Sequence, residues 1–137
     1  MNLDPSAFVA DPALIASLEK GSTSIPCSED RLLFRQGDAP TGLYILKSGH
    51  AVLTMSSTLG EEIISGTAGD GSLLGLPGLV GNQAYTLTAI AEAGAEISFV
   101  TRESFTALMG SDPTLAFKVL TVLAAEVRSA RSVILQR

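Results

Sequence analysis

The middle of the chain alternates between short runs of apolar residues and turns rich in Gly, Asp and Ser, from about residue 31 to residue 100. Such evenly spaced short strands, with helical patterns only at the two ends, are typical of a small β-barrel or jelly-roll sandwich. The pattern predicts six or seven strands, which include residues 31–34, 43–47, 50–55, 61–67, 84–91 and 95–100.

The two ends of the chain carry the helical patterns. The pair Asp11-Pro12 predicts a helix over residues 12–20, because Asp caps a helix and Pro fits its first turn. Near the other end we expect a short helix over residues 104–109, ended by Gly110. The chain is therefore expected to be one domain (1–137), made of an N-terminal helical segment (1–21), a β-barrel (22–101) and C-terminal helices (102–137).

A last helix is predicted from Pro113 to the end of the chain, and it carries two apolar stripes. Leu115, Val119 and Val122 form the first stripe and are expected to pack on the helix's own barrel. The second stripe steps by four and three residues, as in a coiled-coil seam. It predicts a homodimer through Ala116, Leu120, Leu123, Val127, Ala130 and Ile134.

Between Asp70 and Glu92 the chain has no charged residue. Gly75 predicts a tight turn, and Pro77 fits the first turn of a short helix over about residues 76–80. The free N–H groups of such a helix often hold phosphate. Four glycines by position 81, together with a proline, make this stretch a poor membrane span, so no membrane association is expected.

Charge and composition exclude several classes of function. Nine Lys and Arg against fourteen Asp and Glu give a net charge of −5, which argues against nucleic acid or an anionic membrane as a partner. One cysteine, Cys27, and one histidine, His50, leave no basis for a disulfide or a Cys- or His-based metal site. No nucleophile–base pair stands out. We therefore expect no enzyme activity, no metal, no cofactor and a cytoplasmic location.

A set of turn glycines and apolar residues resembles the cyclic-nucleotide-binding domain of the Crp/Fnr (catabolite-activator) superfamily. The set consists of Phe34, Gly37, Asp38, Tyr44, Ile45, Leu46, Gly49 and Val52. The resemblance covers about residues 12–135. It implies a mainly β fold with flanking helices: a double-stranded β-helix, or jelly-roll barrel, followed by a long C-terminal helix.

The resemblance also implies a phosphate-binding cassette, and here the sequence departs from the family. Members hold the nucleotide with an acid after the cassette glycine and an arginine about ten residues on. Leu76 follows Gly75 here, and the arginine position falls on Ala84 or Tyr85. Cyclic AMP or cyclic GMP is therefore disfavoured as a ligand. The candidate pocket residues are Gly75, Leu76, Pro77, Gly78, Leu79, Tyr85, Thr86, Leu87, Thr88, Arg128 and Arg131.

Three hypotheses for what occupies the cavity remain open. Leu76, Leu79, Tyr85 and Leu87 would fill it as packed core, or a less polar effector would bind there. In the third case, Arg128 or Arg131 would reach in from the long helix and hold an anion.

The family resemblance leads to two functional hypotheses. The first is a non-enzymatic, effector-sensing regulatory module of Crp/Fnr type with an unknown small-molecule effector. The second is a structural or protein-interaction domain with a filled, vestigial cavity. Transcription factors of this family continue into a helix-turn-helix after the long helix, whereas this sequence stops at residue 137. DNA binding by this chain alone is therefore not expected.

Overall fold

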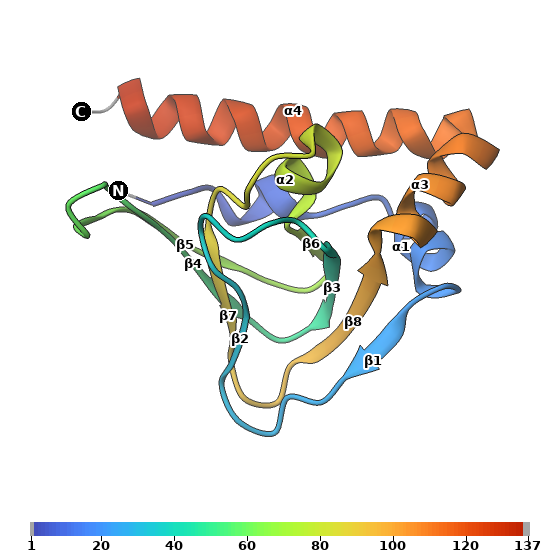
Figure 1. Cartoon of the computed structure of the whole chain (residues 1–137), viewed down its shortest axis with the longest axis horizontal. Helices are drawn as coiled ribbons and strands as arrows, with labels where there is room; N and C mark the ends of the chain where they lie inside the picture. Colours follow the sequence, from blue (N-terminus) through green and yellow to red (C-terminus); the bar gives the residue numbers. More distant parts are fainter. Residues whose placement is uncertain (1, 136–137) are drawn as a thin grey trace.

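Two four-stranded antiparallel sheets face each other in the computed structural model, which describes residues 2–135 (Figure 1). The first sheet has the order β1-β8-β3-β6 and the second has the order β2-β7-β4-β5. The strands are β1 (Thr23–Ile25), β2 (Arg31–Phe34), β3 (Gly42–Ser48), β4 (Ala51–Ser56), β5 (Glu62–Ala68), β6 (Ser72–Leu74), β7 (Thr88–Ala91) and β8 (Glu96–Thr101).

Helices lie before, within and after the strands, and α4 runs along one side of the molecule, past α2 (Figure 1). They are the 3₁₀-helix η1 (Pro5–Phe8), α1 (Pro12–Glu19), α2 (Leu76–Gly81), α3 (Arg102–Ser111) and α4 (Pro113–Leu135). Side-chain oxygens of Asp4, Asp11 and Thr101 cap η1, α1 and α3. In the described residues no single helix has the length and apolarity of a membrane span, although α3 and α4 together, bent by 119°, have the length and composition.

The arrangement confirms the predicted jelly-roll fold with a long last helix, and it corrects three local predictions. The strand expected over residues 84–91 begins only at Thr88, because the segment before it is fixed by the side chain of Tyr85. Two three-residue strands, β1 and β6, lie outside the predicted ranges, so the described residues form eight strands and not six or seven. The short helix ends at Ser111, so Gly110 lies inside α3 and does not stop it.

The buried apolar residues form two clusters on opposite faces of the first sheet. Along β3, Leu43 and Ile45 point to a cluster shared with the helices, whereas Leu46 points between the sheets. We call these clusters the helical core and the barrel core. The predicted first stripe of α4 is buried in the helical core, on the outer face of the barrel. It consists of Leu115, Val119 and Val122. Val133, near the end of α4, belongs to the barrel core.

The N-terminal segment (residues 2–9) lies between β5 and α4. The backbone N–H of Leu3 donates to Ser65 O at 2.8 Å, and that of Asp4 donates to Ser129 Oγ of α4 at 2.9 Å. Leu3, Ala7 and Phe8 are buried in the barrel core. This segment therefore joins the C-terminal half of α4 to the barrel.

Candidate functional site

A left-handed glycine leads from β6 into α2. Gly75 has φ +93°, and a Cβ built there would lie 3.0 Å from Tyr85 Cε1 and 3.4 Å from Phe34 Cε1. Any side chain at this position would therefore combine an unfavourable backbone conformation with a steric clash. The predicted turn and short helix are both present, and α2 extends one residue beyond the predicted end.

Tyr85 closes the space between α2 and the sheets. Its ring stacks on Phe34 with a centroid distance of 4.2 Å, and its side chain is almost fully buried (4% exposed). The hydroxyl donates to Gly42 O at 2.7 Å and accepts from the backbone N–H groups of Thr41 at 3.1 Å and Gly42 at 3.3 Å. All polar capacity of the hydroxyl is thus used within the fold.

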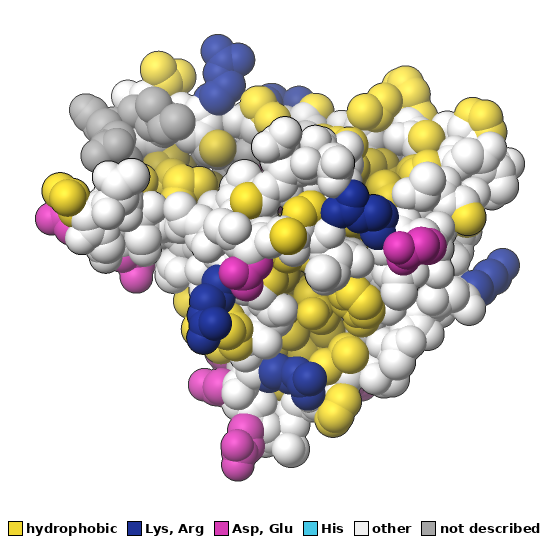
Figure 2. Space-filling model, viewed as in Figure 1, with side chains coloured by type: hydrophobic (Ala, Val, Ile, Leu, Met, Phe, Trp, Pro, Cys, Tyr) yellow, Lys and Arg dark blue, Asp and Glu magenta, His cyan; other side chains and the backbone are white. Residues whose placement is uncertain are grey.

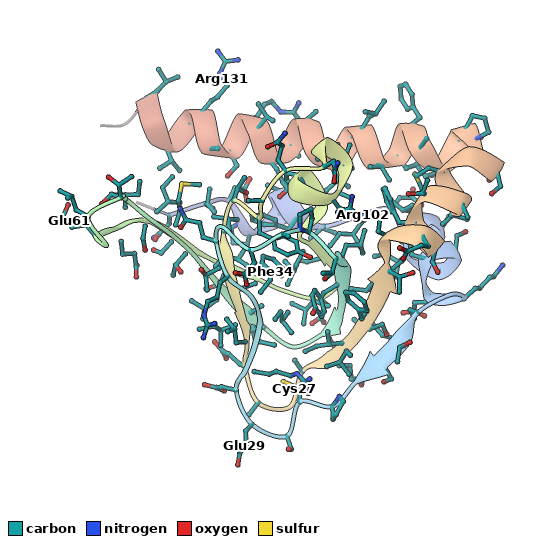
Figure 3. The ribbon with its side chains drawn as sticks, in the orientation of Figure 1. Cys27, Glu29, Phe34, Glu61, Arg102 and Arg131 are labelled. Atoms are coloured by element: carbon teal, nitrogen blue, oxygen red, sulfur yellow. The ribbon has the colours of Figure 1, made fainter. Side chains whose placement is uncertain are left out.

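Only a small space remains beneath α2, which we call the inner hollow. Its free volume is about 10 Å³, about the space of one water molecule. Figure 3 shows Phe34 at the centre of the molecule, below α2. The residues that line the inner hollow are Phe8, Phe34, Leu53, Leu74, Gly75, Pro77, Gly78, Tyr85, Thr86, Leu87 and Glu126.

A larger apolar depression opens on the other side of Glu126, between α4 and the edge of the barrel. Its volume is about 240 Å³. We call it the outer groove, and it shares Phe8, Pro77, Thr86, Leu87 and Glu126 with the inner hollow. Its remaining lining residues are Leu3, Met55, Ile64, Leu123, Val127 and Ala130.

Several sequence-predicted pocket residues lie elsewhere. Leu76 and Leu79 are buried in the helical core and line neither the inner hollow nor the outer groove. The Thr88 hydroxyl accepts from the backbone N–H of Gln36 at 3.0 Å. The structure therefore brings together Gly75, Pro77, Gly78, Tyr85, Thr86 and Leu87 from the predicted set.

Neither candidate arginine of α4 reaches the inner hollow. Arg128 is exposed and lines a different depression beside the N-terminal segment. Arg131 is exposed, and its side chain points away from the barrel (Figure 3). The structure thus contradicts the alternative in which one of them enters the cavity to hold an anion.

The charged residue that α4 does place at the hollow is Glu126, which the sequence reasoning missed. Its Oε2 atom is buried and has no hydrogen-bond partner. Burial raises the pKa of this carboxyl from its ordinary value of 4.5 to about 8. A signal was available, because Glu126 lies four residues after Val122 and so continues the buried stripe of the helix.

The predicted dimer seam lies along one side of α4 and is partly exposed. Leu120 and Val127 are 57% and 56% exposed, and Ala116, Leu123 and Ala130 are half-buried. The side chain of Ile134 lies outside the described residues. Figure 2 shows hydrophobic side chains at several places along the edge formed by α4. The dimer itself stays a prediction.

The cysteine, the histidine and a pair of adjacent glutamates do not form a site in the described residues. Cys27 is buried, and its thiol lies 3.4 Å from Glu29 O and 3.3 Å from Glu92 O. His50 and the pair Glu61–Glu62 are exposed. Across residues 2–135, no three His, Cys, Asp or Glu side chains come together in a way that could hold a metal ion.

Comparison with known proteins identifies the family. Residues 25–112, more than half of the chain, match the model of the cyclic nucleotide-binding domain. The chain belongs to this family. The cyclic AMP receptor protein of Thermus thermophilus is 30% identical to this chain over 98 residues, which cover 72% of this chain and 45% of the relative.

Solved structures agree with the fold of this chain. The catabolite activator protein of Thermus thermophilus superposes with a TM-score of 0.76 at 24% identity, over 88% of this chain and 57% of that chain. The sensor domain of the transcriptional regulator DNR from Pseudomonas aeruginosa superposes with a TM-score of 0.67 at 18% identity, over 89% of this chain and 82% of that chain. The chain spans about half the length of the two Thermus relatives it matches.

Removing the Tyr85 hydroxyl is expected to destabilise the protein. In Tyr85→Phe the ring can still stack on Phe34, but the buried backbone groups of Gly42 lose their partner. We expect the free energy of unfolding to fall by about 1–3 kcal/mol, measured by urea denaturation. The matched control is Tyr44→Phe, on a half-buried ring that also faces Phe34, at 6.0 Å. An equal or larger loss in the control would contradict the anchoring role of Tyr85.

Proposed function

We propose that this chain is a non-enzymatic, effector-responsive regulatory domain of Crp/Fnr type that does not bind cyclic AMP or cyclic GMP in the usual way. The observation that carries the proposal is the position of Tyr85. Tyr85 is one of the two positions, with Ala84, on which the resemblance would place the phosphate-pairing arginine. Its hydroxyl is fully used by Thr41 and Gly42.

Electrostatics at the inner hollow support the same proposal. A cyclic nucleotide carries a negative charge, which is costly to bury without a cationic or hydrogen-bonding partner. Among the described residues that line the hollow, Glu126 is the one charged residue, and it is an acid. Whether neutral or ionised, it offers no positive charge to a phosphate, so binding would lack the strong charge-assisted contacts.

A second candidate function is a structural or protein-interaction domain with a vestigial cavity. The observation in its favour is the small volume of the inner hollow, about 10 Å³. We favour the regulatory function because the outer groove provides about 240 Å³ beside a buried carboxyl that has no partner for one oxygen. A domain that served only as a scaffold has no need for this costly arrangement.

The proposal includes a partner and a location. We propose a cytoplasmic protein that forms a parallel homodimer along the α4 seam, with Leu120 and Val127 at its centre. The net charge of −5 supports the absence of DNA binding by these residues alone. Relatives that continue beyond this region include the Thermus cyclic AMP receptor protein, of which the chain covers 45%.

Isothermal titration calorimetry with cyclic AMP and cyclic GMP tests the ligand part of the proposal. We expect no saturable heat tighter than about millimolar, since two charge-assisted contacts, each worth about 1.5–3 kcal/mol, are missing. The cyclic AMP receptor protein of Thermus thermophilus, titrated in the same buffer, serves as the comparison. Saturable binding in the low micromolar range would contradict the proposal.

A further inference from the structure

Glu126 is a half-buried acid whose Oε2 atom is fully buried, and no countercharge lies in its surroundings. The surfaces that face it come from the N-terminal segment, β2, β4, β5, β6, α2, the 85–87 loop and α4 itself. Among the described residues that line the hollow and the groove there is no Lys, Arg, His, Asp or second Glu. The other titratable group there is Tyr85, whose hydroxyl is engaged by Gly42. Arg128, two residues on, lines a separate depression with Asp4.

An unpaired carboxyl in this apolar surrounding destabilises the ligand-free protein. Burying a carboxylate without a partner is strongly unfavourable, so the group stays protonated instead. Burial accordingly raises the pKa of Glu126 to about 8. A protonated acid still has a donor and acceptors to satisfy, and Oε2 has no partner. No protein atom pairs with Oε2, so a ligand with a polar head can supply this contact.

The lining and volume of the outer groove determine the polarity and size of the rest of the ligand. Apart from Glu126 and Thr86, the residues that line the groove are apolar. Its volume of about 240 Å³ is below the ~300–1,000 Å³ of most small-molecule pockets, so the occupant must be compact. A short apolar body would fit against Met55, Ile64 and Leu123, with its polar head at Glu126.

We propose that the outer groove is a binding site for a small amphiphilic amine, whose ammonium group pairs with the Glu126 carboxylate while its apolar body fills the groove. This inference rests on the proposed effector-responsive function and names the class of effector. Charge complementarity favours a cation. An ammonium group stabilises the ionised carboxyl as an ion pair. An anion would be repelled by that carboxylate, and a neutral alcohol would offer the protonated carboxyl only an ordinary hydrogen bond.

Binding of the amine must displace a proton. The Glu126 carboxyl gives its proton to the buffer, the amine enters already protonated, and the two form an ion pair, so charge and atoms balance. Below pH 8 the carboxyl must first ionise, which lowers the apparent affinity by about tenfold for each pH unit. Above pH 8 this penalty disappears, and the affinity stays constant until the free amine itself loses its proton at about pH 10.

Titration with a series of primary n-alkylamines, from propylamine to hexylamine, tests the inference. Calorimetry at pH 6, 7, 8 and 9, in two buffers with different ionisation enthalpies, gives both the affinity and the protons released. We expect close to one proton released per amine at pH 6 and almost none at pH 9. The affinity should increase about three- to fourfold with each added methylene. Methyl resonances of Met55, Ile64 and Leu123 should shift during the titration.

Two variants separate the role of Glu126 from general effects of charge. Glu126→Gln keeps the size of the side chain, and we expect it to lose proton release and at least tenfold in affinity at pH 8. Glu29→Gln removes an exposed acid at the opposite end of the molecule and should behave as wild type (Figure 3). Hexanol, the neutral counterpart of hexylamine, should bind wild type and Glu126→Gln equally weakly at every pH.

Several outcomes would overturn the inference. These are amine binding that is independent of pH, equal binding by Glu126→Gln, or no shift of the groove methyl groups. Leu123, Val127 and Ala130 belong to both the groove and the proposed dimer seam, so their resonances should also respond to protein dilution. Groove resonances that respond to dilution but not to the amine would overturn the inference, because a second copy of the chain would then fill the groove in place of a ligand. Failure of the proposed function can be distinguished from failure of this inference. It would show as micromolar binding of a cyclic nucleotide in titrations that contain no amine.

Discussion

At pH 8 the Glu126→Gln variant is expected to be more stable than the wild type by a few kcal/mol, whereas near pH 4.5 the two should differ little. The pKa of Glu126 is raised from 4.5 to about 8 by burial. Between these pH values the unfolded chain releases a proton that the folded chain retains, so wild-type stability falls as the pH rises. Each pH unit of separation corresponds to roughly 1.4 kcal/mol. Glutamine does not titrate and escapes this loss.

Urea denaturation of both proteins at pH 4.5, 6 and 8 measures the effect. The wild-type free energy of unfolding should decline across this interval relative to that of Glu126→Gln, and the difference should level off above pH 8. Glu29→Gln, which changes an exposed acid, should follow the wild type at all three pH values. Parallel profiles for wild type and Glu126→Gln would show that the carboxyl is not desolvated in solution.

The Leu120→Asp variant is expected to be monomeric at concentrations where the wild type is dimeric. In a parallel dimer the two introduced carboxylates would face each other across the seam, and burying unpaired charges costs several kcal/mol. The dissociation constant should rise by at least two to three orders of magnitude. Leu120 is 57% exposed in the single chain, so the fold of the monomer should be preserved.

Light scattering coupled to size-exclusion chromatography at about 100 μM decides between the two states. Thr121→Asp is the matched control, because Thr121 is exposed and lies beside the seam rather than on it. A monomeric wild type at this concentration would refute the dimer. Leu123→Asp would be less informative, because Leu123 is half-buried and also lines the outer groove.

The fold was predictable because its signals are local. Turn glycines at fixed intervals and strands that alternate with period two leave few architectures for the middle of the chain. The pairs Asp11-Pro12 and Asp112-Pro113 are local signals too, and they mark the starts of α1 and α4. Gly110 shows the limit of such signals: a single glycine is tolerated within α3, where packing of Phe105 and neighbouring residues outweighs its low helix propensity.

The site was less predictable because it depends on contacts between distant residues. The sequence placed Leu76 beside the cavity, but its side chain is buried in the helical core instead. Tyr85 interacts with Gly42, 43 residues away, which no local pattern indicates. Glu126 was visible only as one polar position in a buried helical stripe, and such a position gains meaning once its surroundings are known.

The N-terminal segment has a consequence for how the domain folds. The hydrogen bond from Asp4 N to Ser129 Oγ joins residues 125 positions apart. Residues 2–9 therefore cannot form this contact until α4, more than 100 residues later in the chain, has been made. Contacts of such high sequence separation slow folding, because the chain must close a long loop before it gains the interaction. We expect docking of residues 2–9 onto α4 to be a late folding event, after the barrel has closed.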